Sequence, residues 1–529
     1  MAIANVKGTP IGYTAIMLAV LASMGGFIFG YDTGQISDVT LMDDYMLRFS
    51  SCTDRTDINT CHWPIGRKGL IVGIFSIGTM VGSLAGSWAV DAMGRRLAMS
   101  ASSAVFIVGL IIQITSVHAW QQYVIGRLVG GWGVGALSVA VPMFQAETAP
   151  PAIRGTITAM YQLFITLGIL VAYCICIGTR YISEAGSWRT VVGIAFIWPT
   201  ILGFGILTMP ESPRWLVAKG RLDDARRSLA RSRGISKEES LTNKQINIEV
   251  EEMRSAYEYE QQVKSNFWSI FELKDKTFYR TALMATIQMF QQLTGANYFF
   301  YYGSTIFKSV GISDSFITQI ILGAVNFGCT FLGMYFFEKF GRRWPLIIGG
   351  LWQSAWLFVF AAAGTAKDPS TSEGIGKLMI VSACLFILGF ASTWAPGAWI
   401  LTGESFPTRT RSSQAAVATM SNWLWNFLLA FFTPFITQAI QFRYGFVFAA
   451  CNLAGAVIVY FFAYESSGLS LEMVDMMYCD PDCKPWNSAN WAPEGFASRA
   501  DIANQGERER AKSPAGIEEG RMEKIDEAH

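Results

Sequence analysis

The hydrophobic residues of this chain gather in long stretches that carry few or no charges. The stretches cover residues 12–31, 70–90, 97–117, 119–146, 155–179 and 190–209, and then 281–307, 315–337, 344–366, 378–403, 412–442 and 444–464. Each is long enough to cross a hydrocarbon core about 30 Å thick as a helix, a conformation that satisfies its own backbone where water is absent. The pattern predicts an all-α membrane protein with twelve transmembrane helices in two six-helix bundles.

Polar segments set the expected domain boundaries. We expect an N-terminal six-helix bundle over 1–209, cytoplasmic linker helices over 210–280, a C-terminal six-helix bundle over 281–465 and a mostly disordered cytoplasmic tail over 466–529. The linker run 222–230 has helical spacing of its apolar residues. Beyond Asp475 this periodicity is lost, which predicts a flexible tail.

Charge near the membrane predicts the orientation. Lysine and arginine gather in the linker and in the loops after the second, fourth, eighth and tenth stretches, which places these segments in the cytoplasm. The loop after the first stretch is acidic instead. Both termini are therefore expected on the cytoplasmic side of a multi-pass protein of the plasma membrane.

Three short signatures occur once in each half, roughly 250 residues apart, as expected for a long internal repeat. They are Gly94-Arg95-Arg96 with Gly341-Arg342-Arg343, the runs 147–154 with 404–411, and Glu211-Ser212 with Glu465-Ser466. A repeat of this length in an apolar chain indicates two related helical bundles, as in secondary transporters.

Composition excludes several classes of function. Hydrophobic residues make up 51% of the chain and charged residues 15%, and the net charge of +1 gives no indication of a nucleic-acid partner. The histidines and cysteines show no metal-binding spacing, so we expect neither a metal nor a cofactor. The sequence contains no recognisable arrangement of a nucleophile and a base that would indicate an enzyme. It also contains no phosphate-binding loop that would indicate the use of ATP.

Two cysteines lie in the acidic loop that is expected outside the cell. A disulfide between Cys52 and Cys61 is chemically possible there. Two free thiols remain the alternative.

The motifs resemble those of the sugar porter family within the major facilitator superfamily, and fungal hexose transporters in particular. The resemblance covers residues 10–475 and is carried by the segments 30–34, 94–96, 126–127, 147–155, 210–216, 291–297, 341–343 and 403–407. Two positions depart from the pattern. Tyr464-Glu465-Ser466 stands where the family has Pro-Glu-Thr, and Ala391 stands where animal facilitators carry a glutamate.

Amide side chains within the expected spans can donate and accept hydrogen bonds without the cost of burying an ion, which suits a polyol. The resemblance implies that six of them bind a sugar at the bilayer midplane: Gln162, Gln291, Gln292, Asn297, Asn326 and Asn426. Residues 291–297 are expected on one face of a helix. Asn422 is a further amide in a span. Hydrogen bonding between helices is the alternative role.

Aromatic and charged residues in the spans complete the candidate site. Trp399 and Trp423 match aromatic positions beside the sugar, where an indole face covers the C–H face of the ring. Asp32 and Arg127 are expected to pair because an isolated ion in the membrane is costly. In related proton symporters this pair is linked to proton coupling, so proton symport, facilitated diffusion and a purely structural pair all remain open.

The repeated signatures are expected to form ion pairs that act as a cytoplasmic gate in this family. The candidates are Arg95, Arg96, Glu147, Arg154 and Glu211 in the first half, and Glu338, Arg342, Arg343, Glu404, Arg411 and Glu465 in the second. Topology signals are the alternative role of the arginines.

These observations predict a secondary transporter of monosaccharides, glucose and related hexoses above all, that alternates between two conformations as a monomer in the lipid bilayer. Protons are the other candidate partner, through symport. The alternative is a transporter-like sugar receptor that signals through its cytoplasmic tail.

Overall fold

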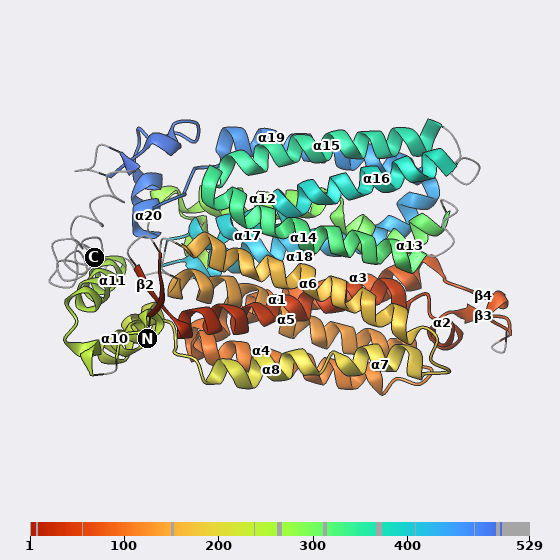
Figure 1. Ribbon diagram of the computed structural model, residues 1–529, viewed down its shortest axis with the longest axis horizontal. Helices are drawn as coiled ribbons and strands as arrows, with labels where there is room; N and C mark the ends of the chain where they lie inside the picture. Colours follow the sequence, from red (N-terminus) through yellow and green to blue (C-terminus); the bar gives the residue numbers. More distant parts are fainter. Residues whose placement is uncertain are drawn as a thin grey trace, which may run out of the picture.

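The computed structural model describes residues 2–6, 9–54, 57–149, 153–236, 238–261, 267–309, 315–366, 373–407, 409–469, 471–493 and 498–499. Long helices run nearly parallel to one another through most of its length (Figure 1). Two pairs of short antiparallel strands, β1 (Ala2–Val6) with β2 (Thr9–Gly12) and β3 (Ser51–Cys52) with β4 (Cys61–His62), lie outside this bundle.

The helices divide into two halves that follow the repeat. The first half contains α1 (Tyr13–Val39), α3 (Ile65–Met93), α4 (Arg95–Ile114), α5 (Trp120–Thr148), α6 (Arg154–Thr179), α7 (Gly186–Ile194) and α8 (Ile197–Leu207). The second contains α12 (Thr277–Leu293), α13 (Ala296–Ser309), α14 (Ser315–Phe340), α15 (Arg343–Ala366), α16 (Glu373–Gly389), the π-helical turn Phe390–Trp394, α17 (Ala395–Glu404), α18 (Arg411–Ile440) and α19 (Tyr444–Phe462). In Figure 1 the first half forms the lower part of the bundle and the second half forms the upper part.

Twelve membrane-crossing segments can be counted in the described residues. Ten helical stretches have the length and hydropathy of a membrane span, and the last of these, 411–462, contains both α18 and α19. Together α12 and α13 supply the remaining segment. The predicted fold class, twelve transmembrane helices in two bundles of six, is confirmed.

The seventh segment differs from the continuous helix that we expected over 281–307. It breaks between α12 and α13 at Gly295, whose φ of +93° lies in the left-handed region that favours glycine. A Cβ atom there would also lie 2.7 Å from the ring of Phe448. Gln291 and Asn297 therefore belong to two helices instead of one face, as in the discontinuous helices of transporter sites.

Glycines allow the helices within the first half to approach closely. A Cβ on Gly135 of α5 would lie 2.1 Å from the carbonyl oxygen of Thr79 on α3, and a Cβ on Gly30 of α1 would lie 1.9 Å from that of Ile165 on α6. Small residues at such crossings are typical of helix packing in membranes. The two halves meet mainly where α3 packs against α18 and where α6 packs against α14 and α17.

The linker forms short helices at one end of the molecule, as expected. They are α9 (Pro213–Ala218), α10 (Leu222–Arg233) and α11 (Lys244–Gln261), and they share a small apolar core that includes Leu216, Leu229 and Val250. The strands β1 and β2 and the last described residues lie at this same end (Figure 1). The end that holds α9 to α11 is called the linker end below.

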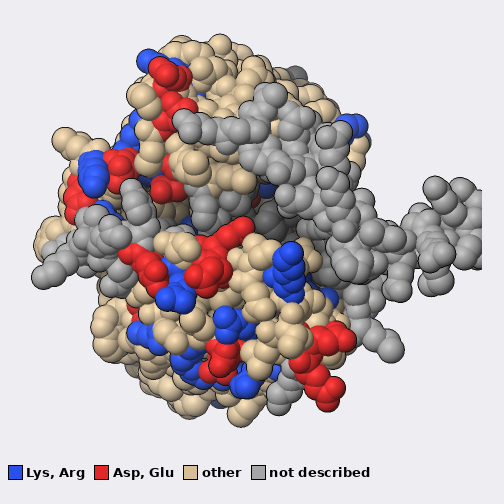
Figure 2. All heavy atoms as spheres, turned by 90° about the vertical axis from the view of Figure 1, so that its left-hand side faces the viewer, with Lys and Arg blue, Asp and Glu red and all other residues tan. Residues whose placement is uncertain are grey.

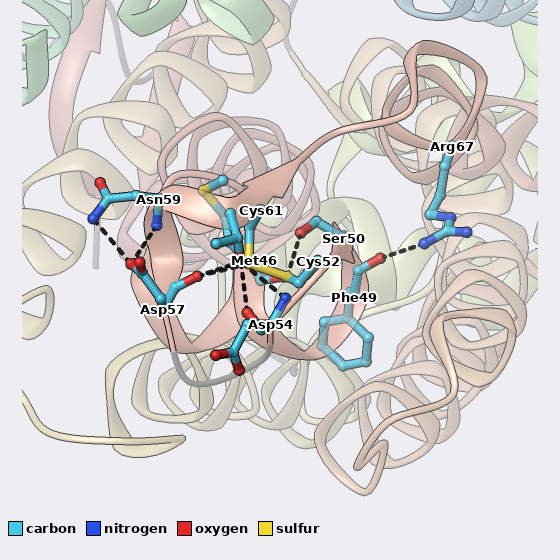
Figure 3. The surroundings of a disulfide bond; sticks show 10 residues. Met46, Phe49, Ser50, Cys52, Asp54, Asp57, Asn59, Cys61 and Arg67 are labelled. Carbon is cyan, nitrogen blue, oxygen red and sulfur yellow. Dashed lines mark hydrogen bonds between the residues drawn. A yellow bond between two sulfur atoms is a disulfide. The ribbon is translucent and has the colours of Figure 1, made fainter.

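The opposite end carries the loop with α2 (Asp43–Phe49), and Cys52 and Cys61 are joined there by a disulfide bond (Figure 3). The bond lies between β3 and β4, in the outer loop where the sequence left the pairing open. Arg67 at the start of α3 donates to the carbonyl oxygen of Phe49 at 3.2 Å, which ties the loop to the bundle.

Part of the segment after residue 466 is folded, unlike the flexible tail that we expected. The helix α20 (Leu471–Cys479) packs Val474, Met477 and Tyr478 against Tyr464, and Asp475 pairs with Arg280 at 2.5 Å. The apolar positions 474, 477 and 478 have helical spacing, but the run is too short to stand out in the sequence. Residues 500–529 lie outside the described residues.

We expect Gly135→Ala to destabilise the protein by about 1–3 kcal/mol, because the added methyl group would force α3 and α5 apart. Thermal unfolding of the purified protein in detergent measures the loss. Gly328→Ala is the matched control, since a Cβ there meets no atom within 4 Å. Equal melting temperatures for the two variants would contradict the close approach of these helices.

Candidate functional site

A cluster of buried amides joins α12 to α18. Gln288, Gln291 and Gln292 share one face of α12, and Asn422 lies opposite them on α18. The Nδ2 of Asn422 donates to Oε1 of Gln288 at 2.7 Å and to Oε1 of Gln291 at 2.6 Å. Its Oδ1 accepts from Nε2 of Gln292 at 2.9 Å. Asn422 therefore holds the three glutamines in fixed orientations.

Asn426, one turn further along α18, links this cluster to the first half. Its Nδ2 donates to Oε1 of Gln292 at 3.2 Å, and its Oδ1 accepts from the hydroxyl groups of Ser76 on α3 at 2.6 Å and Tyr301 on α13 at 3.0 Å. The side chain is fully buried. One amide thus connects α3, α12, α13 and α18.

The structure places three other predicted amides in different surroundings. Asn297, half-buried at the start of α13, donates to Oε1 of Gln292 at 2.5 Å across the helix break. Asn326 on α14 is 1% exposed, and neither its Oδ1 nor its Nδ2 has a partner. Gln162 is buried on α6, which packs against α14. An unpaired buried amide costs about 1–3 kcal/mol, so Asn326 is a strong candidate for contact with a ligand.

Both predicted tryptophans are buried between the halves. Trp423 of α18 packs its ring 4.7 Å from that of Phe29 on α1 and 6.3 Å from that of Phe75 on α3, and its Nε1 has no partner. Trp399 of α17 lies with its ring 5.5 Å from that of Tyr161 on α6. An indole with a free N–H can cover an apolar face and donate one hydrogen bond.

Several residues that join this site were missed in the sequence. Ser76, Tyr301 and Tyr161 contact predicted residues. Gln288 contacts Asn422, which was noted only as an amide in a span. The spacing of Gln288 and Gln292 on one helical face, repeated by Asn422 and Asn426, was the available signal. Ser76 and Tyr161 gave no signal, because their contacts depend on how the halves pack.

Asp32 and Arg127 form the buried ion pair that we predicted. The Nη2 of Arg127 lies 3.1 Å from Oδ2 of Asp32, and its Nη1 lies 3.3 Å from Oδ1. Both side chains are buried. The Nε2 of Gln35 donates to Asp32 at 3.1 Å. The guanidinium group also lies 5.1 Å from the ring centre of Phe75, which in turn contacts Trp423. The pair is therefore a near neighbour of the amide cluster.

At the linker end of the first half, the repeated signatures meet as an ion pair and a helix cap. Arg95 binds Glu147 through both Nε and Nη2, at 2.9 and 2.8 Å, and Ser212 donates to Glu147 at 2.5 Å. Glu211 accepts the backbone N–H of Arg95 at 3.1 Å and that of Arg96 at 3.2 Å, where the positive end of the α4 dipole favours a carboxylate. Burial raises the pKa of Glu211.

The second half repeats this arrangement residue for residue. Arg342 binds Glu404 at 3.1 and 2.9 Å, Ser466 donates to Glu404 at 2.7 Å, and Glu465 accepts the backbone N–H of Arg342 at 2.9 Å and that of Arg343 at 3.0 Å. Burial alone would lower the pKa of Arg342, but Glu404 outweighs it and raises that pKa.

The signature glycine has the same role in both copies. Gly94 and Gly341 have φ of +92° and +80°, and a Cβ on either would lie 2.6 Å from the carboxylate of Glu211 or Glu465. A left-handed residue without a side chain is therefore required where each carboxylate caps its helix.

Glu211 and Glu465 differ from our expectation in one respect, because they bind backbone N–H groups of the signature and not its guanidinium groups. Arg96 donates instead to the carbonyl oxygen of Met209 at 2.9 Å, and Arg343 donates to that of Tyr460. The side chain of Arg154 lies outside the described residues.

Polar contacts join the two halves at the linker end. Thr156 of α6 donates from its N and its Oγ1 to Glu338 of α14, each at 2.9 Å, and Ser412 of α18 donates to Asp91 of α3 at 2.5 Å. Arg411 donates to the carbonyl oxygen of Phe406 and interacts electrostatically with Glu147 across the interface. Each Arg–Glu pair thus stabilises its own half, and these contacts hold the halves together.

A cavity of about 20 Å³ between Trp399 and Arg411 is lined from both halves, by Ser138 and Met143 on one side and by Thr402 and Thr419 on the other. That volume holds about one water molecule. Around Trp399 and Arg411 the two halves therefore lie close together.

Comparison with known proteins identifies the family of this chain. The family model described as "Sugar (and other) transporter" matches residues 18–478. The protein belongs to this sugar transporter family. It is accordingly a multi-pass membrane protein that transports sugars and is not an enzyme.

Relatives of the sugar transporter are found among fungal proteins. The high-affinity glucose transporter ght2 of Schizosaccharomyces pombe is 44% identical over 485 residues, which are 90% of this chain and 90% of that protein. The high-affinity fructose transporter ght6 of the same species is 42% identical over 94% of this chain and 92% of its own length. Hexose transporter 2 of Kluyveromyces lactis is 44% identical over 91% of this chain and 85% of its own.

Solved structures support the fold independently. The proton:xylose symporter XylE, a major facilitator superfamily protein bound to 6-bromo-6-deoxy-D-glucose, is similar with a TM-score of 0.75. The match covers 88% of this chain and 99% of that chain at 23% identity. The sugar transporter therefore has the major facilitator fold.

We expect Glu404→Gln to lower the stability of the sugar transporter by about 3 kcal/mol, because it leaves the charge of buried Arg342 without its partner. Glu258→Gln is the matched control. Glu258 pairs with Arg254 at 2.7 Å, as closely as Glu404 pairs with Arg342, but this pair is exposed. Loss of the exposed pair should therefore leave the melting temperature unchanged. Equal shifts on thermal unfolding would show that burial does not determine the strength of the Arg342–Glu404 pair.

Proposed function

We propose that this sugar transporter carries hexoses, glucose and its close relatives above all, by alternating access across the plasma membrane. The observation that carries the proposal is the set of buried amides and two tryptophans on helices that pack between the halves, of which Asn326 and Trp423 have unpaired polar atoms. A hexose has many neutral donors and acceptors and an apolar C–H face, which matches this set. The glucose, fructose and hexose transporters among its relatives support the same class of substrate.

The roles of the residues follow from their partners. Gln291, Gln292 and Asn426 are oriented by bonds to Asn422 and to one another, so their remaining lone pairs and N–H groups present a fixed pattern to a sugar. Asn326 and Gln162 approach from α14 and α6, and Trp399 and Trp423 cover the ring. A preorganised site loses little entropy when the sugar binds.

Opening toward the cytoplasm requires only that the contacts between the halves break. The Thr156–Glu338 and Ser412–Asp91 hydrogen bonds are each worth about 1–3 kcal/mol because one partner is charged, a range in which substrate binding can shift the balance between two conformations. The Arg95–Glu147 and Arg342–Glu404 pairs stay intact as each half moves. In this proposal the linker end and both termini face the cytoplasm, and one chain is the working unit.

The Asp32–Arg127 pair is compatible with two modes of transport. Its carboxylate could bind a proton as the halves move, or the pair could remain charged and serve packing alone while the sugar gradient drives the transport. None of the residues that form the amide cluster is an acid, so Asp32 is the acid beside it. Proton symport in this proposal would therefore pass through Asp32.

Uptake of labelled sugars in a yeast strain that lacks its own hexose transporters tests the proposal. We expect saturable uptake of glucose that unlabelled fructose or galactose reduces by competition. A protonophore in the same assay separates the modes, because symport would stop when the proton gradient collapses and facilitated diffusion would not. Absence of uptake for every hexose, with the protein present at the cell surface, would refute the proposal.

Asn326→Leu should separate binding from stability. The change removes a buried amide without a partner, so we expect the melting temperature to stay the same or rise while the apparent affinity for glucose falls at least about tenfold. Gln353→Leu is the control in the same half. The Nε2 of Gln353 donates to the carbonyl oxygen of Gly349 at 3.0 Å, so its loss should lower stability and leave the affinity unchanged. Unchanged affinity in Asn326→Leu would remove this residue from the site.

A further inference from the structure

A second polar pocket lies at the linker end of the first half, away from the amide cluster. It has a volume of about 290 Å³ and lies between the start of α4 and the helices α9 and α10. Its lining includes four arginines, two acids, one serine and an apolar edge: Arg96, Arg221, Arg227, Arg231, Glu211, Asp224, Ser228, Met93, Leu97 and Trp215. Sugar recognition does not account for this composition.

The pocket carries an excess of positive charge. The two carboxylates are already occupied, since Asp224 pairs with Arg221 at 2.8 Å and with Arg227 at 3.5 Å, and Glu211 accepts backbone N–H groups at the start of α4. Arg96 and Arg231 donate only to neutral carbonyl oxygens among the bonds described, those of Met209 and Thr208. Four guanidinium groups face two carboxylates, which leaves two positive charges without an anion.

The pocket also lies at the level where the membrane spans end. The spans of α3, α4 and α8 end or begin at Met93, Arg95 and Thr208, directly beside it. Met93 and Leu97 in its lining are 39% and 48% exposed, and α8, which packs against α4, exposes the apolar residues Phe204 and Leu207. Arginine next to an exposed apolar strip matches a phosphate group that carries acyl chains.

Figure 2 views this end of the molecule and shows arginine and lysine interspersed with acids across it. The pocket differs from that general surface because its basic residues converge on one volume. The second half has no matching site in the described residues, since α9 and α10 have no counterpart after Glu465, where α20 packs instead.

We propose that the pocket between α4, α9 and α10 binds a phosphate group, carried by a phospholipid of the adjoining leaflet or by a soluble phosphate compound. Arg96, Arg227 and Arg231 supply charged N–H donors, and Ser228 also lines the pocket. Ser228 also donates to the carbonyl oxygen of Glu211 at 2.5 Å, so a ligand held here would stabilise the loop that caps α4.

Native mass spectrometry of the purified sugar transporter tests the proposal with three probes: short-chain phosphatidic acid, short-chain phosphatidylcholine and glycerol 3-phosphate. We expect one phosphatidic acid molecule to bind in preference to phosphatidylcholine. If glycerol 3-phosphate competes at a similar concentration, the ligand of the pocket is a soluble phosphate compound. If it does not compete, the ligand is the lipid. If no probe binds with a stoichiometry of one, the proposal is wrong.

Matched arginine variants locate the site. Arg231→Gln should weaken phosphatidic acid binding at least about tenfold, since it removes a charge-assisted hydrogen bond from the pocket. Arg226→Gln is the control, because Arg226 lies on the same helix but pairs with Asp223 outside the pocket lining. An equal loss in both variants would indicate diffuse attraction to a basic surface and overturn the proposal. The readout is independent of sugar uptake, so it stands or falls separately from the proposed function.

Discussion

A polar side chain buried between helices in a membrane has to find its partner inside the protein, because lipid offers none. This constraint organises the whole interior of the molecule. Asn422 satisfies three glutamine side chains of α12, and Arg127 satisfies Asp32. The first arginine of each signature, Arg95 or Arg342, satisfies the glutamate of its own half. Among the groups that remain unpaired, those of Asn326 on α14 and Trp423 on α18 belong to helices that pack against the other half, where a ligand can complete them. Others, such as the amide of Gln113, lie within one half.

The duplication reproduces chemistry as well as topology. Arg95 with Glu147 and Arg342 with Glu404 make the same two-point contact, and in each copy a glycine with positive φ lets a carboxylate cap the next helix. Because these contacts remain within one half, each bundle can move as a rigid body without breaking a buried ion pair. The motion then acts on the weaker contacts between the halves, such as that of Thr156 with Glu338.

Much of this could be predicted from the sequence, because lipid imposes long apolar runs and makes each buried charge conspicuous. The spans, the Asp32–Arg127 pair and the arginine–glutamate pairs of the signatures all followed from these rules. The break at Gly295 did not, since glycine is also common within spans, and neither did the folded α20, whose apolar run is short. Ser76 and Thr156 could not be predicted, because their partners are fixed only by the packing of one half on the other.

The bond between Ser76 and Asn426 shows how binding and motion can be linked. An amide oxygen has two lone pairs, and the Oδ1 of Asn426 already accepts from Ser76 and from Tyr301. A sugar hydroxyl that donates to this oxygen must therefore displace one of them. Displacing Tyr301 leaves α3 and α18 joined through Ser76, although Tyr301 itself is also bonded to Thr33 of α1. Displacing Ser76 breaks the direct bond between α3 and α18. In the second case the sugar replaces a contact that holds α3 against α18, so its binding energy acts on the equilibrium between conformations.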